Sequence, residues 1–285
     1  GVHIGHRKIL EKVTQNTESD TTESLVLTFF PHPRMVLQGQ SDVKLLNTIG
    51  EKIDLLETLG VQNLVIHPFD EVFSKLTAEE FVKTVLVEQF HIQKIIIGHD
   101  HRFGRNRTAN IDDLIAFGQQ YDFEVEQISV QEIKEVSISS TKIRNALTEG
   151  NMALANDYLG YEYFLTGTVS KGKELGRTIG FPTANIQIEE NDKLIPQNGV
   201  YVVKSIINQK TVFGMMNIGF NPTVAGEKLS VEVHYFDFDA DLYDQEIRVS
   251  ILEYLRAEQK FSSVPLLKEQ LEKDKDAAWT YIKNL

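Results

Sequence analysis

Two histidines stand three residues apart at the start of the sequence, in Gly1-Val2-His3-Ile4-Gly5-His6. If this segment begins a helix, His3 and His6 lie on one face of it. The helix N-terminus favours an anion, and the glycines let a phosphate approach the backbone. A metal-binding pair or two surface histidines are the alternatives, so the spacing alone leaves the chemistry open.

A second polar group lies in Ser139-Ser140-Thr141-Lys142-Ile143-Arg144. We expect this segment to open a helix that runs to about Glu149, with Gly150 as its last residue. Its hydroxyls and the Arg144 guanidinium suit a phosphate. An ordinary helix cap is the simpler interpretation, because Ser and Thr are common at that position.

A third group is Gly180-Phe181-Pro182-Thr183-Ala184-Asn185. On a strand, Thr183 and Asn185 share one face and can reach one magnesium ion or phosphate. The alternative is a strand edge that follows a proline. The preceding Ser170–Gly180 segment is rich in glycine and can surround phosphates with backbone amides. It lacks the spacing of a P-loop.

Glu232 alternates with Val231 and Val233 in a predicted strand. Its carboxylate therefore faces away from both valines. From the pattern alone, a solvated carboxylate is the preferred interpretation and a general base is the alternative.

The first half of the chain alternates apolar runs with amphipathic segments. The runs predict four strands, at Leu25–Phe30, Asn63–Phe69, Lys94–Asp100 and Phe123–Ser129. Between them we expect helices at Glu51–Leu59, after a capping box at Thr77–Glu80, and at Ile111–Gln120 with Asn110 as cap. This alternation predicts a doubly wound α/β domain over residues 1–158. Ligands of such sheets bind at the carboxyl ends of the strands.

The second half, residues 159–285, changes to a period of two. We expect six strands, at Phe164–Val169, Thr183–Ile188, Val200–Ile207, Val212–Ile218, Val231–Asp237 and Ile247–Tyr254. A turn at Asn208–Lys210 joins the third to the fourth. These strands predict a small antiparallel β-barrel, followed by one charged helix at Pro265–Leu285.

Composition excludes several classes of protein. The net charge of −12 and pI near 5.2 disfavour a broad nucleic-acid groove. The chain has no cysteine, which excludes disulfides and thiolate sites. No apolar run approaches the length of a membrane span, and no signal peptide is visible. We expect a cytoplasmic protein that binds neither nucleic acid nor membrane and needs no obligate protein partner.

Taken together, the motifs resemble a known family. The histidine pair and the Ile138–Arg144 segment are similar to the nucleotidylyltransferase superfamily. Thr28–Pro33 (TFFPHP), Gly98–Gly104 (GHDHRFG) and Val136–Leu147 narrow the resemblance to the FAD synthetase domain of bacterial bifunctional riboflavin kinase/FMN adenylyltransferases. Four later segments resemble the riboflavin kinase domain of that family. They are Gly176–Ile186, Met216–Thr223, Val231–Phe238 and Leu255–Phe261.

The resemblance implies two ATP-dependent reactions, riboflavin to FMN and FMN to FAD, each with Mg²⁺. In the first domain, His3 and His6 would stabilise charge at the ATP phosphates. The triphosphate would be held by Ser139, Ser140, Thr141 and Arg144, and His32 and Asp100 would lie along FMN.

In the second domain, the resemblance makes Glu232 the base for the riboflavin 5′-hydroxyl. Thr183 and Asn185 would bind magnesium and phosphate. Gly172 and Gly176 would contact nucleotide phosphates. The walls of the flavin and nucleotide sites would include Asn217, Asn221, Arg256 and Phe261.

Members of this family carry a strand and a G-x-F-D segment before the G-V-H residues. We therefore expect the sequence to begin inside that motif and to lack this strand. Two other functions stay open: an adenylyltransferase for another phosphorylated small molecule, with a noncatalytic barrel, and a nonenzymatic flavin-binding protein.

Overall fold

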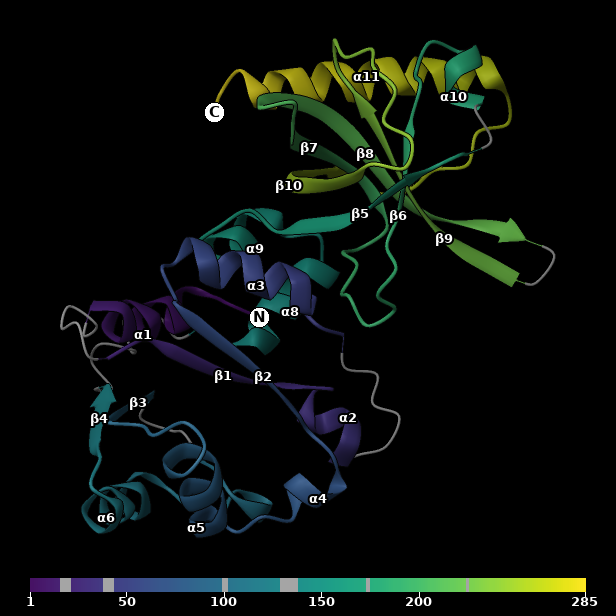
Figure 1. The fold of residues 1–285 in the computed structure, drawn as a ribbon. Helices are drawn as coiled ribbons and strands as arrows, with labels where there is room; N and C mark the ends of the chain where they lie inside the picture. Colours follow the sequence, from purple (N-terminus) through teal and green to yellow (C-terminus); the bar gives the residue numbers. More distant parts are fainter. Residues whose placement is uncertain (16–21, 38–43, 99–101, 129–137, 173–174, 224–225) are drawn as a thin grey trace. The chain divides into compact units, whose positions relative to one another are not determined.

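The structure is a computed structural model that describes residues 1–285 except 16–21, 38–43, 99–101, 129–137, 173–174 and 224–225. The described chain divides into two compact units, Gly1–Ser139 and Ser140–Leu285 (Figure 1). The expected division at residues 158 and 159 lies about one helical hairpin further along the chain. Within the described part of the chain, no helix combines the length and apolar character needed to cross a membrane.

The first unit contains the four predicted strands, paired in parallel. β1 (Leu25–Phe30) pairs with β2 (Asn63–Pro68), and β3 (Lys94–Gly98) pairs with β4 (Glu124–Ile128). The helical segments of this unit are α1 (Ile4–Gln15), α2 (Pro33–Leu37), α3 (Ile49–Thr58), α4 (Glu71–Ser74), α5 (Ala78–Phe81), the π-helix η1 (Val82–Val87), the 3₁₀ helix η2 (Arg105–Arg107) and α6 (Ile111–Tyr121). Strands and helices alternate along the chain, as predicted for an α/β fold.

Side-chain caps fix the starts of α3, α5 and α6. The predicted capping box at Thr77 and the predicted cap at Asn110 are both confirmed. α3 begins earlier than expected, because Thr48 and Glu51 form a further capping box. The backbone N–H groups of Thr48 and Glu51 are therefore both satisfied by side chains.

Apolar residues fasten α1 and α3 to the β1–β2 pair. Val2, Leu10 of α1 and Leu56 of α3 are buried together and pack against Val26 and Leu64 of the two strands. The segment that carries His3 is thereby held against the sheet. A second cluster around Leu114 fills the space between η1, α6 and the β3–β4 pair.

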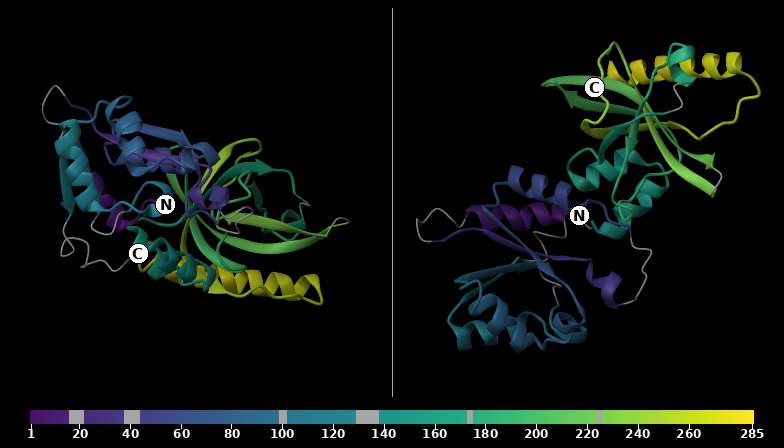
Figure 2. Two further views of the ribbon diagram at one scale, coloured as in Figure 1. Left: turned by 90° about the horizontal axis from the view of Figure 1, so that it is seen from below. Right: turned by 45° about the vertical axis from the view of Figure 1, so that its right-hand side comes forward.

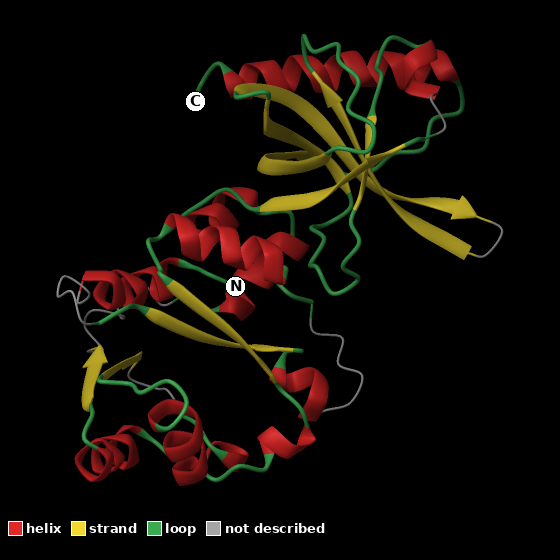
Figure 3. Cartoon of the chain, in the orientation of Figure 1, coloured by secondary structure: helices red, strands yellow, loops and turns green. Residues whose placement is uncertain are grey.

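The second unit contains the predicted six-stranded antiparallel barrel, whose strands are yellow in Figure 3. The barrel is closed in the order β10-β5-β6-β9-β8-β7. Its strands are β5 (Phe164–Ser170), β6 (Ala184–Gln187), β7 (Gly199–Ile207), β8 (Lys210–Thr223), β9 (Gly226–Tyr235) and β10 (Glu246–Arg256). Asn208 and Gln209 join β7 to β8 with φ of 51° and 63°, as a two-residue hairpin requires. The barrel and its turn confirm the prediction.

Helices cover parts of this barrel. The C-terminal helix α11 (Val264–Ile282), yellow in Figure 2, runs along one face of it. Trp279 of this helix stacks on Phe236. α8 (Ser140–Thr148) and α9 (Met152–Leu159) form a hairpin, and α9 packs on β10. The Asn156 amide donates to Ile251 O and accepts from Tyr163 N, which ties α9 to the barrel. A short helix, α10 (Leu175–Thr178), precedes β6.

Candidate active sites

The two N-terminal histidines lie together at the start of α1. Their rings stack with centroids 3.9 Å apart and an interplanar angle of 27°. The His3 carbonyl accepts from His6 N and Arg7 N, so His3 occupies the residue before the helix. A Cβ on Gly5 would come within 3.2 Å of the His3 ring, so a side chain there would crowd the imidazole. The predicted spacing therefore brings both rings to one helix N-terminus.

Burial keeps this pair uncharged. The His3 side chain is buried, and its Nδ1 has no hydrogen-bond partner among the described residues. Burial, with a smaller contribution from the neighbouring His6, lowers the pKa of His3 to about 3. Desolvation also lowers the pKa of His6 to about 4, although the residue as a whole is exposed to solvent. Both rings are neutral at pH 7, so each offers one N–H donor and one acceptor nitrogen.

The four phosphate-binding candidates around residue 140 fall on both sides of the division between the units. Ser139 is the last residue of the first unit, whereas Ser140, Thr141 and Arg144 lie in α8 of the second. Ser140 and Arg144 are half-buried and Thr141 is exposed. Their joint action with His3 on one triphosphate stays a prediction.

The two flavin candidates of the first unit differ in what is described. His32 follows β1, and its Nδ1 accepts from Arg34 N at 3.2 Å. Asp100 lies outside the described residues. The sequence did not single out an aromatic cluster at the carboxyl ends of β1 and β2, formed by Phe29, His67, Phe69 and Phe73. Apolar ring surface thus lies at the end of the sheet where ligands are expected.

The second site is built around the Glu232 carboxylate on β9. Thr183 Oγ1 donates to Glu232 Oε2 at 3.3 Å, and Ser230 Oγ donates to Oε1 at 2.8 Å. Thr183 lies just before β6, which begins one residue later than expected. Two hydroxyls therefore orient the carboxylate of a half-buried glutamate, which is more order than a solvated side chain needs.

Strand register places three predicted residues in one row. Asn185 on β6 is opposite Glu232 on β9, and Glu232 is opposite Asn217 on β8. Residues directly opposite one another in antiparallel strands project to the same face. Asn221 lies further along β8, opposite Lys228 on β9. The structure describes the backbone of Asn221 but not its side chain.

Two glycines shape the segment around Thr183. A Cβ on Gly172 would lie 2.1 Å from Nδ2 of Asn185, so a larger residue there would displace this amide. A Cβ on Gly176 would collide with the Phe181 carbonyl. Gly176 O also accepts from Phe181 N at 2.8 Å, which closes the loop before Pro182. Both candidates thus shape the loop, and their contact with phosphate stays a prediction.

His234 is a residue that the sequence did not single out. Its ring lies between Phe181 and Phe236, and its Nδ1 is 2.8 Å from the Pro182 carbonyl. Burial lowers the pKa of His234, so the ring is neutral and Nδ1 carries the proton for this bond. The contact fixes the backbone next to Thr183. The only local signal was its position two residues after Glu232, on the same face of the strand.

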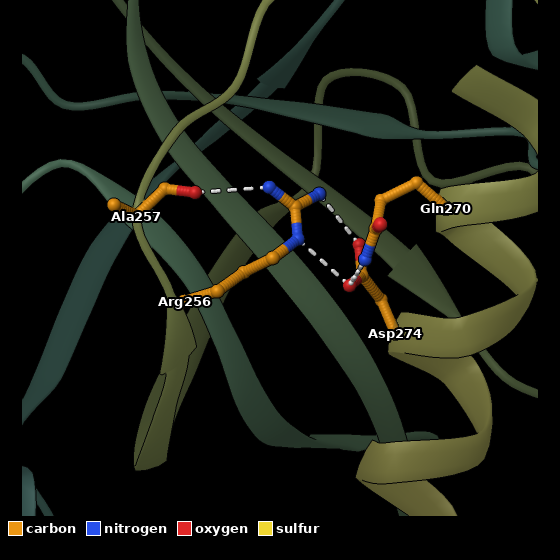
Figure 4. A network of polar contacts seen from close by, with 4 residues as sticks. All are labelled: Arg256, Ala257, Gln270 and Asp274. Atoms are coloured by element: carbon orange, nitrogen blue, oxygen red, sulfur yellow. Dashed lines mark hydrogen bonds and ion pairs between the residues drawn. The ribbon is translucent and has the colours of Figure 1, made fainter. Parts of the chain in front are cut away.

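Arg256 and Phe261 lie where β10 leads toward α11. The guanidinium binds the buried Asp274 with two bonds, from Nε at 2.8 Å and from Nη2 at 2.7 Å (Figure 4). Nη1 donates to Ala257 O, and Gln270 donates to the same aspartate. Phe261 lies 6.0 Å from the guanidinium carbon. Arg256 therefore ties α11 to the barrel, and its contact with flavin stays a prediction.

The second site has the donors that a magnesium ion prefers. The Thr183 hydroxyl and the Asn185 amide supply oxygens beside the Glu232 carboxylate, and Mg²⁺ is bound by few protein oxygens together with substrate phosphates. Within the described ranges no cluster of three or more His, Asp or Glu side chains is arranged to hold a metal alone. These residues fit an ion that is held jointly with a nucleotide.

Comparison with known proteins identifies the two units. The FAD synthetase family model matches residues 1–142, and the riboflavin kinase family model matches residues 159–282. A bifunctional riboflavin kinase/FMN adenylyltransferase of Listeria monocytogenes is 39% identical over 276 residues, which cover 96% of this chain and 87% of that protein. The protein of the same description from Bacillus subtilis is 37% identical over 293 residues, covering 100% and 90%.

A solved structure agrees in fold. The crystal structure of a protein described as a macrolide-efflux protein, from Streptococcus pneumoniae, is 31% identical with a TM-score of 0.87. The match covers 97% of this chain and 90% of that one.

These matches define a two-part flavin-related transferase. The chain belongs to the bifunctional riboflavin kinase/FMN adenylyltransferase family. Membership implies ATP as a co-substrate.

Proposed function

We propose that the barrel phosphorylates riboflavin with ATP to give FMN and ADP, and that the first unit adenylylates FMN with a second ATP to give FAD and pyrophosphate. One observation carries the proposal. Thr183, Asn185 and Glu232 converge from segments about 50 residues apart, with a hydroxyl bonded to a carboxylate and an amide in register with it.

In the kinase step, Glu232 accepts the proton of the riboflavin 5′-hydroxyl as that oxygen attacks the γ-phosphorus of ATP. Ser230 and Thr183 each occupy one lone pair of the carboxylate, which has about four, so acceptor capacity remains for the substrate. A positioned base contributes on the order of 10²–10⁴-fold to the rate.

Thr183 and Asn185 are the residues that would hold Mg²⁺ with the ATP phosphates. The ion would neutralise charge that develops on the transferred phosphoryl group. His234 and Gly172 act on this pair indirectly, because one bonds the backbone before Thr183 and the other leaves room for the Asn185 amide.

In the adenylylation step no protein nucleophile is needed. A phosphate oxygen of FMN attacks the α-phosphorus of ATP, and pyrophosphate leaves. His3 and His6 donate N–H groups toward the phosphates from the start of α1, where the helix also favours negative charge. Bound phosphate raises the pKa of both rings and draws protons to them.

The remaining residues extend these two sites. Ser139, Ser140, Thr141 and Arg144 would hold the triphosphate, and His32 and Asp100 would lie along the flavin of FMN. The walls of the kinase site would include Asn217, Asn221, Arg256 and Phe261, and its phosphate loop would include Gly172 and Gly176. The cytoplasmic location is a further prediction, which cell fractionation tests.

Product analysis tests the proposal. Incubation with riboflavin, ATP and Mg²⁺ should give FMN first and FAD later. The ADP released should equal the riboflavin consumed, and the pyrophosphate released should equal the FAD formed. Thr183→Ala should stop FMN formation while supplied FMN is still converted to FAD. A double variant with His3→Ala and His6→Ala should still form FMN from riboflavin but should not convert supplied FMN to FAD. A chain that consumes no riboflavin above the blank contradicts the kinase assignment, and adenylylation of another phosphorylated molecule in place of FMN contradicts the second.

A further inference from the structure

Lys52 projects from α3 to β1, and no motif of the sequence pointed to it. It lies in the first turns of α3, directly after the capping box of Thr48 and Glu51. The residues before α3 contact the histidine segment, because Asn47 Oδ1 accepts from Val2 N at 3.2 Å. The start of α3 is therefore fixed relative to His3.

The lysine reaches across to the sheet. Its Nζ donates to Thr28 Oγ1 at 3.0 Å. Thr28 lies in the carboxyl-terminal half of β1, where ligands of parallel sheets bind. The Lys52 ammonium is also close enough to His6 for its charge to lower the pKa of that ring. The ammonium thus lies near enough to His6 for its charge to act on that ring, and it points to the ligand end of the strand.

This position is unfavourable for a cation without an anion. Lys52 is half-buried, and desolvation lowers its pKa. Among the described residues, its polar contact is a neutral hydroxyl, and no carboxylate pairs with it. A desolvated charge is normally paired. An ammonium has three donors, and Thr28 uses one of them, so two remain for an anionic ligand.

We propose that the Lys52 ammonium binds a substrate phosphate beside His3 and His6, and that Thr28 fixes its direction. The proposal rests on the adenylylation function assigned to this unit. The phosphate belongs either to ATP or to FMN, and both present the same chemistry to an ammonium. The alternative is a purely structural bond that fastens α3 to β1.

Steady-state kinetics of the full chain separate these roles. Lys52→Met removes the charge, Lys52→Arg keeps it, and Thr28→Val removes only the neutral partner. Lys83→Met is the matched control, since Lys83 is an exposed lysine of the same unit. Adenylylation is followed by pyrophosphate release with ATP and FMN varied in turn. Riboflavin phosphorylation in the same samples and thermal unfolding report whether each variant is folded.

Lys52→Met should lower kcat/KM for adenylylation by about 10- to 100-fold, the range of a hydrogen bond to a charged group. The KM that rises identifies whether ATP or FMN carries the phosphate. Lys52→Arg should recover part of the lost kcat/KM. Thr28→Val should lower kcat/KM by less than about 10-fold, and Lys83→Met should have the kcat/KM of the unsubstituted chain. Riboflavin phosphorylation should be unchanged in all four.

Two results overturn the proposal. One is an unchanged kcat/KM in a folded Lys52→Met variant. The other is an equal loss in Thr28→Val with no recovery in Lys52→Arg, which indicates a structural bond. If the unsubstituted chain does not adenylylate FMN, the assigned function fails, and calorimetric binding of ATP and FMN to the same variants decides the role of Lys52. Equal affinity of Lys52→Met and the unsubstituted chain for both ligands, or no binding by either, refutes the proposal.

Discussion

Replacing Glu232 with glutamine is the sharpest test of the kinase site. The change keeps the shape of the side chain and removes its ability to take a proton. Ser230 and Thr183 each donate a hydroxyl to the carboxylate. The amide of glutamine can accept from one hydroxyl and donate to the other, because a hydroxyl is both donor and acceptor. The local hydrogen bonds therefore survive the substitution.

The expected sizes of the two effects differ widely. Exchange of a charged for a neutral acceptor in a half-exposed site changes the free energy of unfolding by about 1 kcal/mol. Loss of the base lowers the rate of riboflavin phosphorylation by about 10²–10⁴-fold, which corresponds to about 3–5 kcal/mol in the barrier. Folding and catalysis are thus separable in one variant.

The assay compares FMN formation from riboflavin with FAD formation from supplied FMN. Glu232→Gln should lose the first and keep the second, with a midpoint of thermal unfolding close to that of the unsubstituted chain. Ser230→Ala is the matched control, because it removes one hydrogen bond to the carboxylate and leaves the base. It should slow phosphorylation by less than about 10-fold. Phosphorylation by Glu232→Gln within 10-fold of normal would show that the carboxylate is not the base.

Three further predictions concern other parts of the chain. Gly172→Ala places a Cβ 2.1 Å from Nδ2 of Asn185, and the resulting shift of about 1 Å should slow riboflavin phosphorylation by about 100-fold. His3 has a folded-state pKa of about 3, below its ordinary value of 6.5, so its contribution to stability is complete above pH 6.5 and is lost as the pH falls toward 3. When the pH falls from 7 to 5, the free energy of unfolding, measured by denaturant titration, should decrease by about 2 kcal/mol more in the unsubstituted chain than in His3→Gln. A fragment of residues 140–285 should phosphorylate riboflavin and unfold at higher denaturant than a fragment of residues 151–285, because the buried face of α8 packs within the second unit.

Each of these has a control and a contradicting result. Gly50→Ala matches the glycine change, since its Cβ would meet nothing closer than 3.9 Å, and equal kinase rates for the two variants contradict the role given to Asn185. Parallel loss of stability with pH in the chain and in His3→Gln shows that His3 does not titrate as described. Equal denaturation midpoints for the two fragments show that α8 adds nothing to the second unit.

Local patterns predict the elements of the fold closely. The run at Leu25–Phe30 forms a strand with the predicted bounds, and the caps at Thr77 and Asn110 start helices as expected. The start of α3 was missed, because its capping box encloses Gly50, a residue that disfavours helices. Propensity and capping pattern disagreed there, and the cap decided the structure.

Contacts between distant elements could not be predicted in this way. A single lysine on an amphipathic helix is normally solvated, so nothing in the sequence pairs Lys52 with Thr28. Arg256 and Asp274 lie 18 residues apart on a strand and a helix, and their bond depends on how the two elements pack. The proximity of Thr183 to Glu232 was expected only through family resemblance, since strand order is not a local property.

The shortest strand of the barrel has a consequence for when the kinase is active. β6 pairs with β5 at three positions and with β9 at two, whereas β8 and β9 pair at ten. Because so few pairs hold β6 to its neighbours, we expect β6 to separate from them at a lower free-energy cost than unfolding of the whole barrel. Such an opening would separate Asn185 from Glu232. We therefore expect a nucleotide or metal that bridges these two residues to oppose the local opening of β6.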